Sequence, residues 1–152
     1  MPMMTHQLRP ESKGSVHIKA PDPRKHPSIR FNFLAERVDR DCVIASMRIV
    51  RRLIAAPELA WLGAEELAPG PGVSSDDELL DFVTRTAETT YHPVGTCRMG
   101  SDPLAVVDDQ LRVHGIAGLR VADASIMPSD CRANTHFTTV VIGEAIARMM
   151  MR

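Results

Sequence analysis

The chain has 152 residues, the length of one ordinary domain, and its 18 basic and 19 acidic residues leave a formal net charge of -1. A domain of this length buries roughly 68 to 70% of the surface that its unfolded chain exposes. Because the charges balance, the chain has no net electrostatic field that would attract nucleic acid or an anionic membrane, and we exclude both as partners. The spacing of the three cysteines fits neither a disulfide framework nor a zinc site, so we expect a cytoplasmic chain without a metal site. The sequence has neither a secretory signal nor an apolar window of about 18 residues, so we expect a soluble chain without a transmembrane segment.

The first third of the chain predicts two strands and an amphipathic helix. Residues 15 to 18 (SVHI) and 29 to 34 (IRFNFL) are β-leaning runs, and three prolines in the segment between them argue against a continuous element. Residues 38 to 55 place apolar side chains at helical spacing, with Arg48 and Arg52 on the opposite side. We interpret these arginines as a solvated helix face.

A proline- and glycine-rich linker, PGPGVSS at residues 69 to 75, separates this helix from a second one. Ser75 is followed three residues later by Glu78, the pattern of a capping box that starts a helix. We expect this helix to end near Glu88.

The last 50 residues predict strands followed by a helix. Residues 111 to 113 (LRV) and 119 to 127 (LRVADASIM) have strand composition, with glycines at the turn between them. From residue 138 to 152, apolar side chains occupy nearly every direction around a helix. Such a helix should be buried among other elements, and Gly143 within it would let a backbone or a ligand approach closely.

The stretch YHPVGTCRMG, residues 91 to 100, restricts the position of one histidine. Proline after His92 biases that residue toward an extended backbone, and Gly95 allows conformations closed to other residues. This pattern is typical of an imidazole held in a functional site. A simple turn with a surface histidine would also explain it.

A second candidate region is SDCRANTHFTT, residues 129 to 139, where the last helix should begin. Asn134 could cap the helix and satisfy its unpaired backbone N–H groups. Alternatively, the partial positive charge of the helix N-terminus could stabilise an anion, such as a phosphate or a reduced flavin ring.

Three ordered blocks carry a resemblance to a known family: HPVGTCRMG, VVDDQLRVHGIAGLRVADASIMP and ANTHFTTVVIGEAIARMM. In order and spacing they resemble the C-terminal part of glucose-methanol-choline oxidoreductases, and most closely the choline dehydrogenase-like branch. With LRPESKGSV at residues 8 to 16, the resemblance covers nearly the whole chain. It implies an α+β fold, with antiparallel strands and helices of a substrate-binding portion at residues 1 to 100. Residues 101 to 152 would return, as a strand and a buried helix, to an FAD-binding domain.

The resemblance also implies a reaction, the FAD-dependent oxidation of an alcohol. His92 matches the catalytic histidine of the family, which takes up the hydroxyl proton as a hydride passes to the flavin. Asn134 matches the second catalytic position, where its amide would stabilise developing alkoxide charge.

Cofactor-binding residues follow from the same resemblance. Asp123 and Ala124 should lie along the ribityl and phosphate portion of FAD, and the backbone groups of His136 and Phe137 should face the pyrimidine edge. Relatives often have a second asparagine where this chain has His136, so only the backbone contact is carried over at that position.

The dinucleotide-binding fingerprint GxGxxG of the family is not found in the sequence, and Gly70 and Gly72 lie in the linker without a preceding strand. We therefore expect the chain to correspond to the C-terminal piece of a larger enzyme, with a small alcohol as substrate and an FAD-binding N-terminal half as partner. The alternative is a non-catalytic remnant or interaction module that retains the half-site and needs a separate flavin-binding chain.

Overall fold

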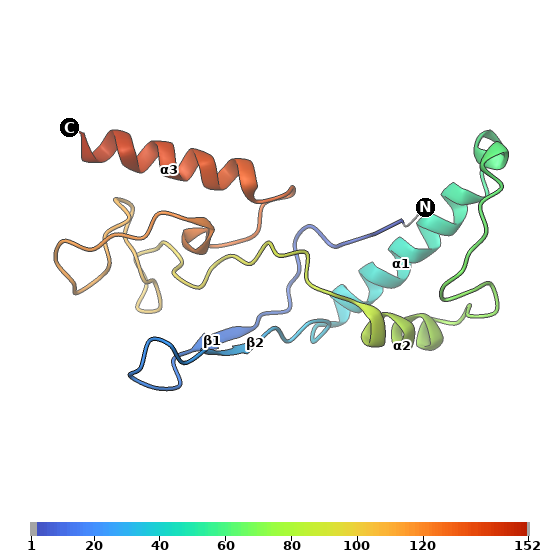
Figure 1. Ribbon diagram of the computed structural model, residues 1–152, viewed down its shortest axis with the longest axis horizontal. Helices are drawn as coiled ribbons and strands as arrows, with labels where there is room; N and C mark the ends of the chain where they lie inside the picture. Colours follow the sequence, from blue (N-terminus) through green and yellow to red (C-terminus); the bar gives the residue numbers. More distant parts are fainter. Residues whose placement is uncertain (1–2, 152) are drawn as a thin grey trace. The chain divides into compact units, whose positions relative to one another are not determined.

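The computed structural model describes residues 3–151, and the chain forms two compact units (Figure 1). Unit 1 is built from Met1–Gly14 and Phe31–Thr90, and unit 2 from Ser15–Arg30 and Tyr91–Arg152. Within residues 3–151, no helix combines the length and the apolar character that crossing a membrane requires.

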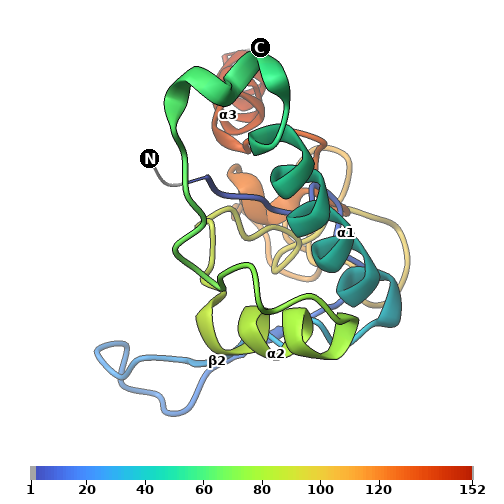
Figure 2. The ribbon, with the colours of Figure 1, turned by 90° about the vertical axis from the view of Figure 1, so that its right-hand side faces the viewer.

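Unit 1 consists of two helices and a short 3-10 segment: α1 (Arg37–Ile54), η1 (Pro57–Leu62) and α2 (Asp76–Thr86). α1 and α2 lie side by side (Figure 2). Each helix buries one apolar side chain, Ile44 of α1 and Leu79 of α2. Both predicted helices are confirmed within two residues at each end.

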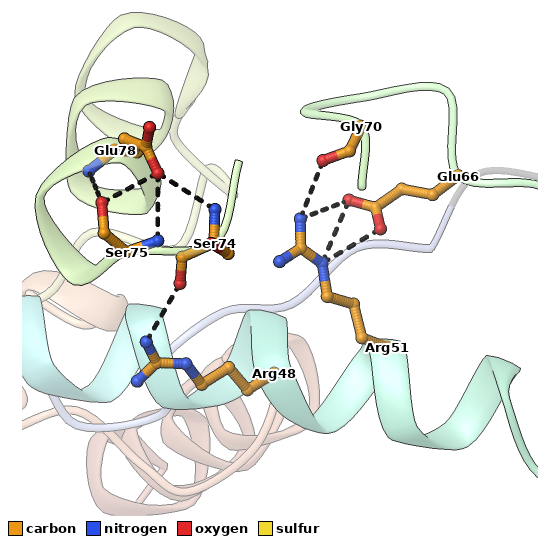
Figure 3. A network of polar contacts seen from close by, with 7 residues as sticks. All are labelled: Arg48, Arg51, Glu66, Gly70, Ser74, Ser75 and Glu78. Atoms are coloured by element: carbon orange, nitrogen blue, oxygen red, sulfur yellow. Dashed lines mark hydrogen bonds and ion pairs between the residues drawn. The ribbon is translucent and has the colours of Figure 1, made fainter. Parts of the chain in front are cut away.

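The start of α2 is the predicted capping box (Figure 3). The Ser75 hydroxyl accepts from the backbone N–H of Glu78, and the Glu78 carboxylate accepts from the backbone N–H of Ser75 at 3.0 Å. Arg48 of α1 remains exposed, as predicted, but also donates to the carbonyl oxygen of Ser74. Its neighbour Arg51 binds the Glu66 carboxylate with two nitrogens and the Gly70 carbonyl at 3.1 Å, which ties the linker to α1.

A buried carboxylate joins the N-terminal segment of unit 1 to α1. Asp39, with 2% of its surface exposed, accepts from the backbone N–H groups of Glu11 at 3.0 Å and Ser12 at 2.7 Å. The Ser12 hydroxyl in turn accepts from the N–H of Glu36, the residue that precedes α1. The segment before Lys13 is therefore held by polar contacts to the first turn of the helix.

Unit 2 contains the predicted antiparallel strands, β1 (Ser15–His17) and β2 (Ser28–Arg30), paired in a register that sets Val16 opposite Ile29. β2 ends earlier than the predicted residue 34. Asn32 and Leu34 both adopt a φ of +57°, and left-handed backbone of this kind cannot continue a strand.

The core of unit 2 is formed by four buried residues: Val107, Leu111, Ile126 and Ile146. The strands predicted at 111 to 113 and 119 to 127 are wrong as continuous elements, because the described chain there makes only isolated bridges and then a 3-10 turn, η2 (Ala124–Ile126). Leu111 has a φ of +60°, and the Asp123 side chain bonds to the backbone two residues on, which favours a turn over a strand.

α3 (His136–Met150) closes unit 2 and begins two residues before the predicted start. It lies beside η2, and among its described residues only Ile146 is buried. The expectation of a fully buried helix is therefore not met in this chain: 65% of Val141 and 69% of Met150 are exposed. The physical reason is that α3 has apolar side chains on several sides, and the core of unit 2 covers only one of these sides.

Candidate functional site

His92 lies in unit 2 and its half-buried imidazole is held by a side chain at the start of α3. Its Nδ1 is 2.9 Å from the hydroxyl oxygen of Thr135, 43 positions later in the chain. The two candidate regions of the sequence therefore meet at a direct hydrogen bond.

The backbone on both sides of His92 is restricted. Tyr91 adopts a φ of +59°, which is uncommon for a bulky residue, and Gly95 adopts +84°. For a non-glycine residue such as Tyr91, this backbone costs of order 1–3 kcal/mol and persists only where the surroundings enforce it. Together with Pro93, these residues limit the directions in which the imidazole can point.

The segment after His92 is held against η2 by backbone hydrogen bonds. Cys97 N–H donates to the Ser125 carbonyl at 3.0 Å, and Met99 N–H donates to the Ile126 carbonyl at 2.8 Å. A Cβ at Gly95 would lie 3.5 Å from the Met127 carbonyl oxygen, so the loop runs close to the chain that follows η2.

An ion pair closes the end of this loop. Arg98 pairs with the Asp102 carboxylate, which also accepts from the N–H of Leu104. The hydrogen bonds from Arg98, followed by that from Leu104, lower the pKa of Asp102 to about 2. A Cβ at Gly100 would come within 3.2 Å of the Arg98 guanidinium and within 3.1 Å of the Asp102 carboxylate. A side chain at this position would therefore require both groups to shift by a few tenths of an ångström.

Asn134 does not cap α3. Thr135 is the residue at the N-cap position, and neither it nor another side chain caps the helix. The structure therefore does not support the interpretation of Asn134 as a structural cap, and leaves its side chain exposed, next to Thr135 in the chain.

The first turn of α3 offers backbone donors. The earliest helical bond at this end runs from Thr139 N–H to the Thr135 carbonyl, and by helix geometry the N–H groups of His136 and Phe137 have no partner within the helix. Phe137 is 79% exposed, and His136 packs edge to face against it at a ring-centroid distance of 5.6 Å. Uncapped donors and the helix dipole at this end suit a flat, anionic group.

Asp123 and Ala124 lie at η2, which contacts α3 within unit 2. The Asp123 carboxylate accepts from the backbone N–H of Ser125 at 2.8 Å and from its hydroxyl. One of its oxygens thus stabilises its own turn.

The start of α3 fits one end of FAD better than the other. The α3 N-terminus could face the anionic edge of a flavin ring, whereas the sequence has no glycine-rich turn for the pyrophosphate. Of the two ends of such a cofactor, the start of α3 therefore has donors for the ring.

The comparisons with known proteins show the class of oxidoreductases to which the chain belongs. Residues 10–143 match the family model described as GMC oxidoreductase. The chain therefore belongs to the GMC oxidoreductase family, whose members are FAD flavoproteins, and the resemblance found in the sequence is confirmed.

A curated relative is the oxygen-dependent choline dehydrogenase of Cronobacter sakazakii, 48% identical over 140 residues, which are 92% of this chain and 25% of the relative. Among solved structures, pyridoxine 4-oxidase from Mesorbium loti is 37% identical with a TM-score of 0.84, over 93% of this chain and 28% of that one. A formate oxidase structure from Aspergillus oryzae RIB40, concerned with FAD modification, has a TM-score of 0.86 at 33% identity over 93% and 25% of the two chains. The chain thus spans about a quarter of the length of these relatives.

Thr135 is the site residue that the sequence did not indicate. A threonine before a helix is ordinarily a cap, and nothing in the local sequence signals a partner 43 residues away. The structure instead directs this hydroxyl to His92.

Proposed function

We propose that this chain supplies the substrate-oxidising residues of an FAD-dependent enzyme that acts on the CH–OH group of a small alcohol. The observation that carries the proposal is the hydrogen bond that holds the imidazole of His92 to Thr135, the residue after Asn134 at the uncapped start of α3. Membership of the GMC oxidoreductase family supports the reaction class.

His92 is the proton acceptor in this proposal. Imidazole is the side chain that changes charge near neutral pH, so it can take the hydroxyl proton of the substrate and later release it. Loss of that proton raises electron density on the carbinol carbon. A bound FAD would supply the acceptor for the hydride that leaves this carbon.

Asn134 stabilises the substrate oxygen. Its exposed side-chain amide can donate to an oxygen on which negative charge develops, an interaction that strengthens in the transition state. The neighbouring helix N-terminus adds partial positive charge at the same end of α3.

The remaining site residues are proposed to bind the cofactor. Asp123 and Ala124 would lie along its ribityl and phosphate portion, and the backbone of His136 and Phe137 would face the pyrimidine edge. The pyrophosphate would be held by a flavin-binding polypeptide with the GxGxxG turn, because the sequence printed here has none. We call this chain together with that polypeptide, continuous or separate, the flavin-loaded enzyme.

The substrate class and setting are supported by the relatives and by composition. Several curated relatives are named oxygen-dependent choline dehydrogenase, which favours a choline-like alcohol. The three cysteines are free, which fits a cytoplasmic setting.

A second candidate function is a non-catalytic module that binds another chain. The exposed apolar residues of α3, among them Phe137, Val141 and Met150, favour it because such surfaces mark interfaces. In this case His92 and Asn134 would retain their positions without a reaction.

The test is anaerobic reduction of the flavin-loaded enzyme by a panel of small alcohols, choline among them, followed by visible absorption. We expect at least one alcohol to bleach the flavin, and the matched His92→Ala variant to remain oxidised. A control variant, His26→Ala, changes an exposed histidine in the loop between β1 and β2 and should behave as wild type. Flavin that no alcohol reduces would favour the non-catalytic module.

A further inference from the structure

We propose that Thr135 is a positioning residue for His92: its hydroxyl accepts a hydrogen bond from Nδ1–H and so keeps Nε2 free to take the substrate proton. This inference rests on the proposed function. It adds a residue to which the family resemblance assigned no role.

The contact has the geometry of a specific hydrogen bond. Thr135 Oγ1 and His92 Nδ1 are 2.9 Å apart, and Thr135 is only 6% exposed although its neighbours Asn134 and His136 are exposed. Water therefore competes little for this hydroxyl, and a buried hydroxyl without a partner would cost free energy.

Thr135 is itself held in place by the helix. Its carbonyl oxygen accepts from the backbone N–H of Thr139 and from the Thr139 hydroxyl, both at 2.9 Å. Its own hydroxyl makes no cap bond to the helix. The side chain is thus fixed by the backbone and directed to the imidazole.

The direction of the hydrogen bond follows from what the reaction requires. A neutral imidazole carries one N–H, and it can accept a proton at Nε2 only if that hydrogen is on Nδ1. With Thr135 as acceptor, Nδ1–H donates to the hydroxyl before and after Nε2 takes the proton, so no group has to turn. If Thr135 were the donor, the neutral ring would carry its hydrogen on Nε2, which could then accept no proton. If the ring were protonated on both nitrogens, the hydrogen on Nδ1 would face the hydroxyl hydrogen of Thr135.

The proton balance is simple. The O–H bond of the alcohol breaks and an Nε2–H bond forms on His92, while the hydride leaves the carbon for the flavin as in the proposed function. Thr135 exchanges no proton with the substrate. Its contribution is to select the tautomer and orientation of the ring.

Two substitutions separate the hydroxyl from the shape of the residue. Thr135→Val keeps the branched side chain and removes the hydroxyl, and Thr135→Ser keeps the hydroxyl. We expect flavin reduction to be roughly 10- to 100-fold slower in Thr135→Val, with KM unchanged. This loss is smaller than the 10²- to 10⁴-fold that proton transfer typically contributes, because His92 itself is still present. Thr135→Ser should restore most of the rate, and both variants should retain flavin.

A spectroscopic readout tests the tautomer independently of activity. In the flavin-loaded enzyme with ¹⁵N-labelled histidine, long-range ¹H–¹⁵N correlations report which nitrogen of His92 is protonated, and His92→Ala identifies its signals. We expect Nδ1–H in the wild type and a shift toward Nε2–H in Thr135→Val. A wild-type ring protonated at Nε2 would overturn the proposal, even if Thr135→Val failed to fold.

The same variants distinguish failure of this inference from failure of the proposed function. If His92→Ala abolishes oxidation while Thr135→Val oxidises the alcohol at the wild-type rate, only the role of Thr135 is wrong. If His92→Ala itself turns over normally, the proposed function is wrong and this inference with it.

Discussion

The backbone N–H of Met99 donates to the carbonyl oxygen of Ile126 over 2.8 Å, and this bond joins the segment after His92 to the turn before α3. A parallel bond from Cys97 to Ser125 adds a second attachment. Because Ile126 belongs to the core of unit 2, the position of the histidine loop depends on the packing of that core. The site is therefore built on a rigid base rather than on a free loop.

The first prediction concerns His92. In the flavin-loaded enzyme, His92→Ala should lower the rate of alcohol oxidation about 10²- to 10⁴-fold, because the proton acceptor is lost, while the flavin content stays normal. Stopped-flow reduction and the visible spectrum measure the two quantities. Near wild-type turnover would refute the assignment of His92 as proton acceptor.

The second prediction concerns Asn134. Asn134→Ala should slow oxidation because the amide donor to the substrate oxygen is lost. Its unfolding midpoint should stay close to that of the wild type, since Thr135 and not Asn134 occupies the N-cap position. A large loss of stability with unchanged turnover would show that Asn134 has a structural role after all.

The third prediction concerns the capping box of α2. Ser75→Ala removes the hydroxyl that accepts from Glu78 N–H, and should destabilise the helix start by about 1 kcal/mol. Amide hydrogen exchange in the first turn of α2 should then become roughly 5-fold faster. Ser101→Ala, outside any helix, is the control, and equal exchange in both variants would contradict the cap.

The fourth prediction concerns the pH dependence of the Asp39 contact. Burial raises the pKa of Asp39, but hydrogen bonds from Ser12 and Glu11 outweigh it and leave the pKa below the ordinary value of 3.8. Because the folded-state pKa is lowered, the stabilisation is present above the unfolded pKa. It is lost as the pH falls through the lower, folded value.

Asp39→Asn tests this contact, because an amide has one acceptor oxygen and would direct its NH₂ toward the other donor. At neutral pH we expect faster hydrogen exchange at the N–H groups of Glu11 and Ser12, and the difference from wild type should shrink below about pH 4. Asp41→Asn, an exposed carboxylate on the same helix, is the matched control. A difference that persists at low pH would contradict the assignment.

The fifth prediction concerns the chain by itself. We expect the isolated 152-residue chain to purify without flavin and without alcohol oxidation, and to associate through the exposed apolar side of α3. Gel filtration after refolding with FAD, monitored by visible absorption, provides the test. Stoichiometric flavin that elutes with a monomer would show that these residues form a complete cofactor site.

Much of the local structure was predictable because its causes lie within a few residues. The capping box at Ser75 and Glu78 defined the start of α2, and apolar periodicity defined α1. The ordered blocks around His92 and Asn134 indicated the family, which the match over residues 10–143 confirms. The roles of these two residues remain predictions for the experiments above.

Other features were decided only by the tertiary structure. Residues 119 to 127 have strand composition, but Asp123 bonds within its own turn and the chain forms η2 instead. α3 is apolar enough to be buried, yet its exposure depends on which surfaces pack against it. The composition of a segment indicates which secondary structure and which degree of burial it favours, whereas tertiary packing determines whether the segment adopts them.

The sequence by itself determined the helices of unit 1, the restricted backbone around His92 and the family of the chain, because periodicity, caps and proline act locally. Only the tertiary structure decided that the Thr135 hydroxyl meets Nδ1 of His92 and that Asp39 holds Glu11 and Ser12. These contacts join residues 43, 28 and 27 positions apart. Their formation depends on the path of the intervening chain, which no local pattern of residues specifies.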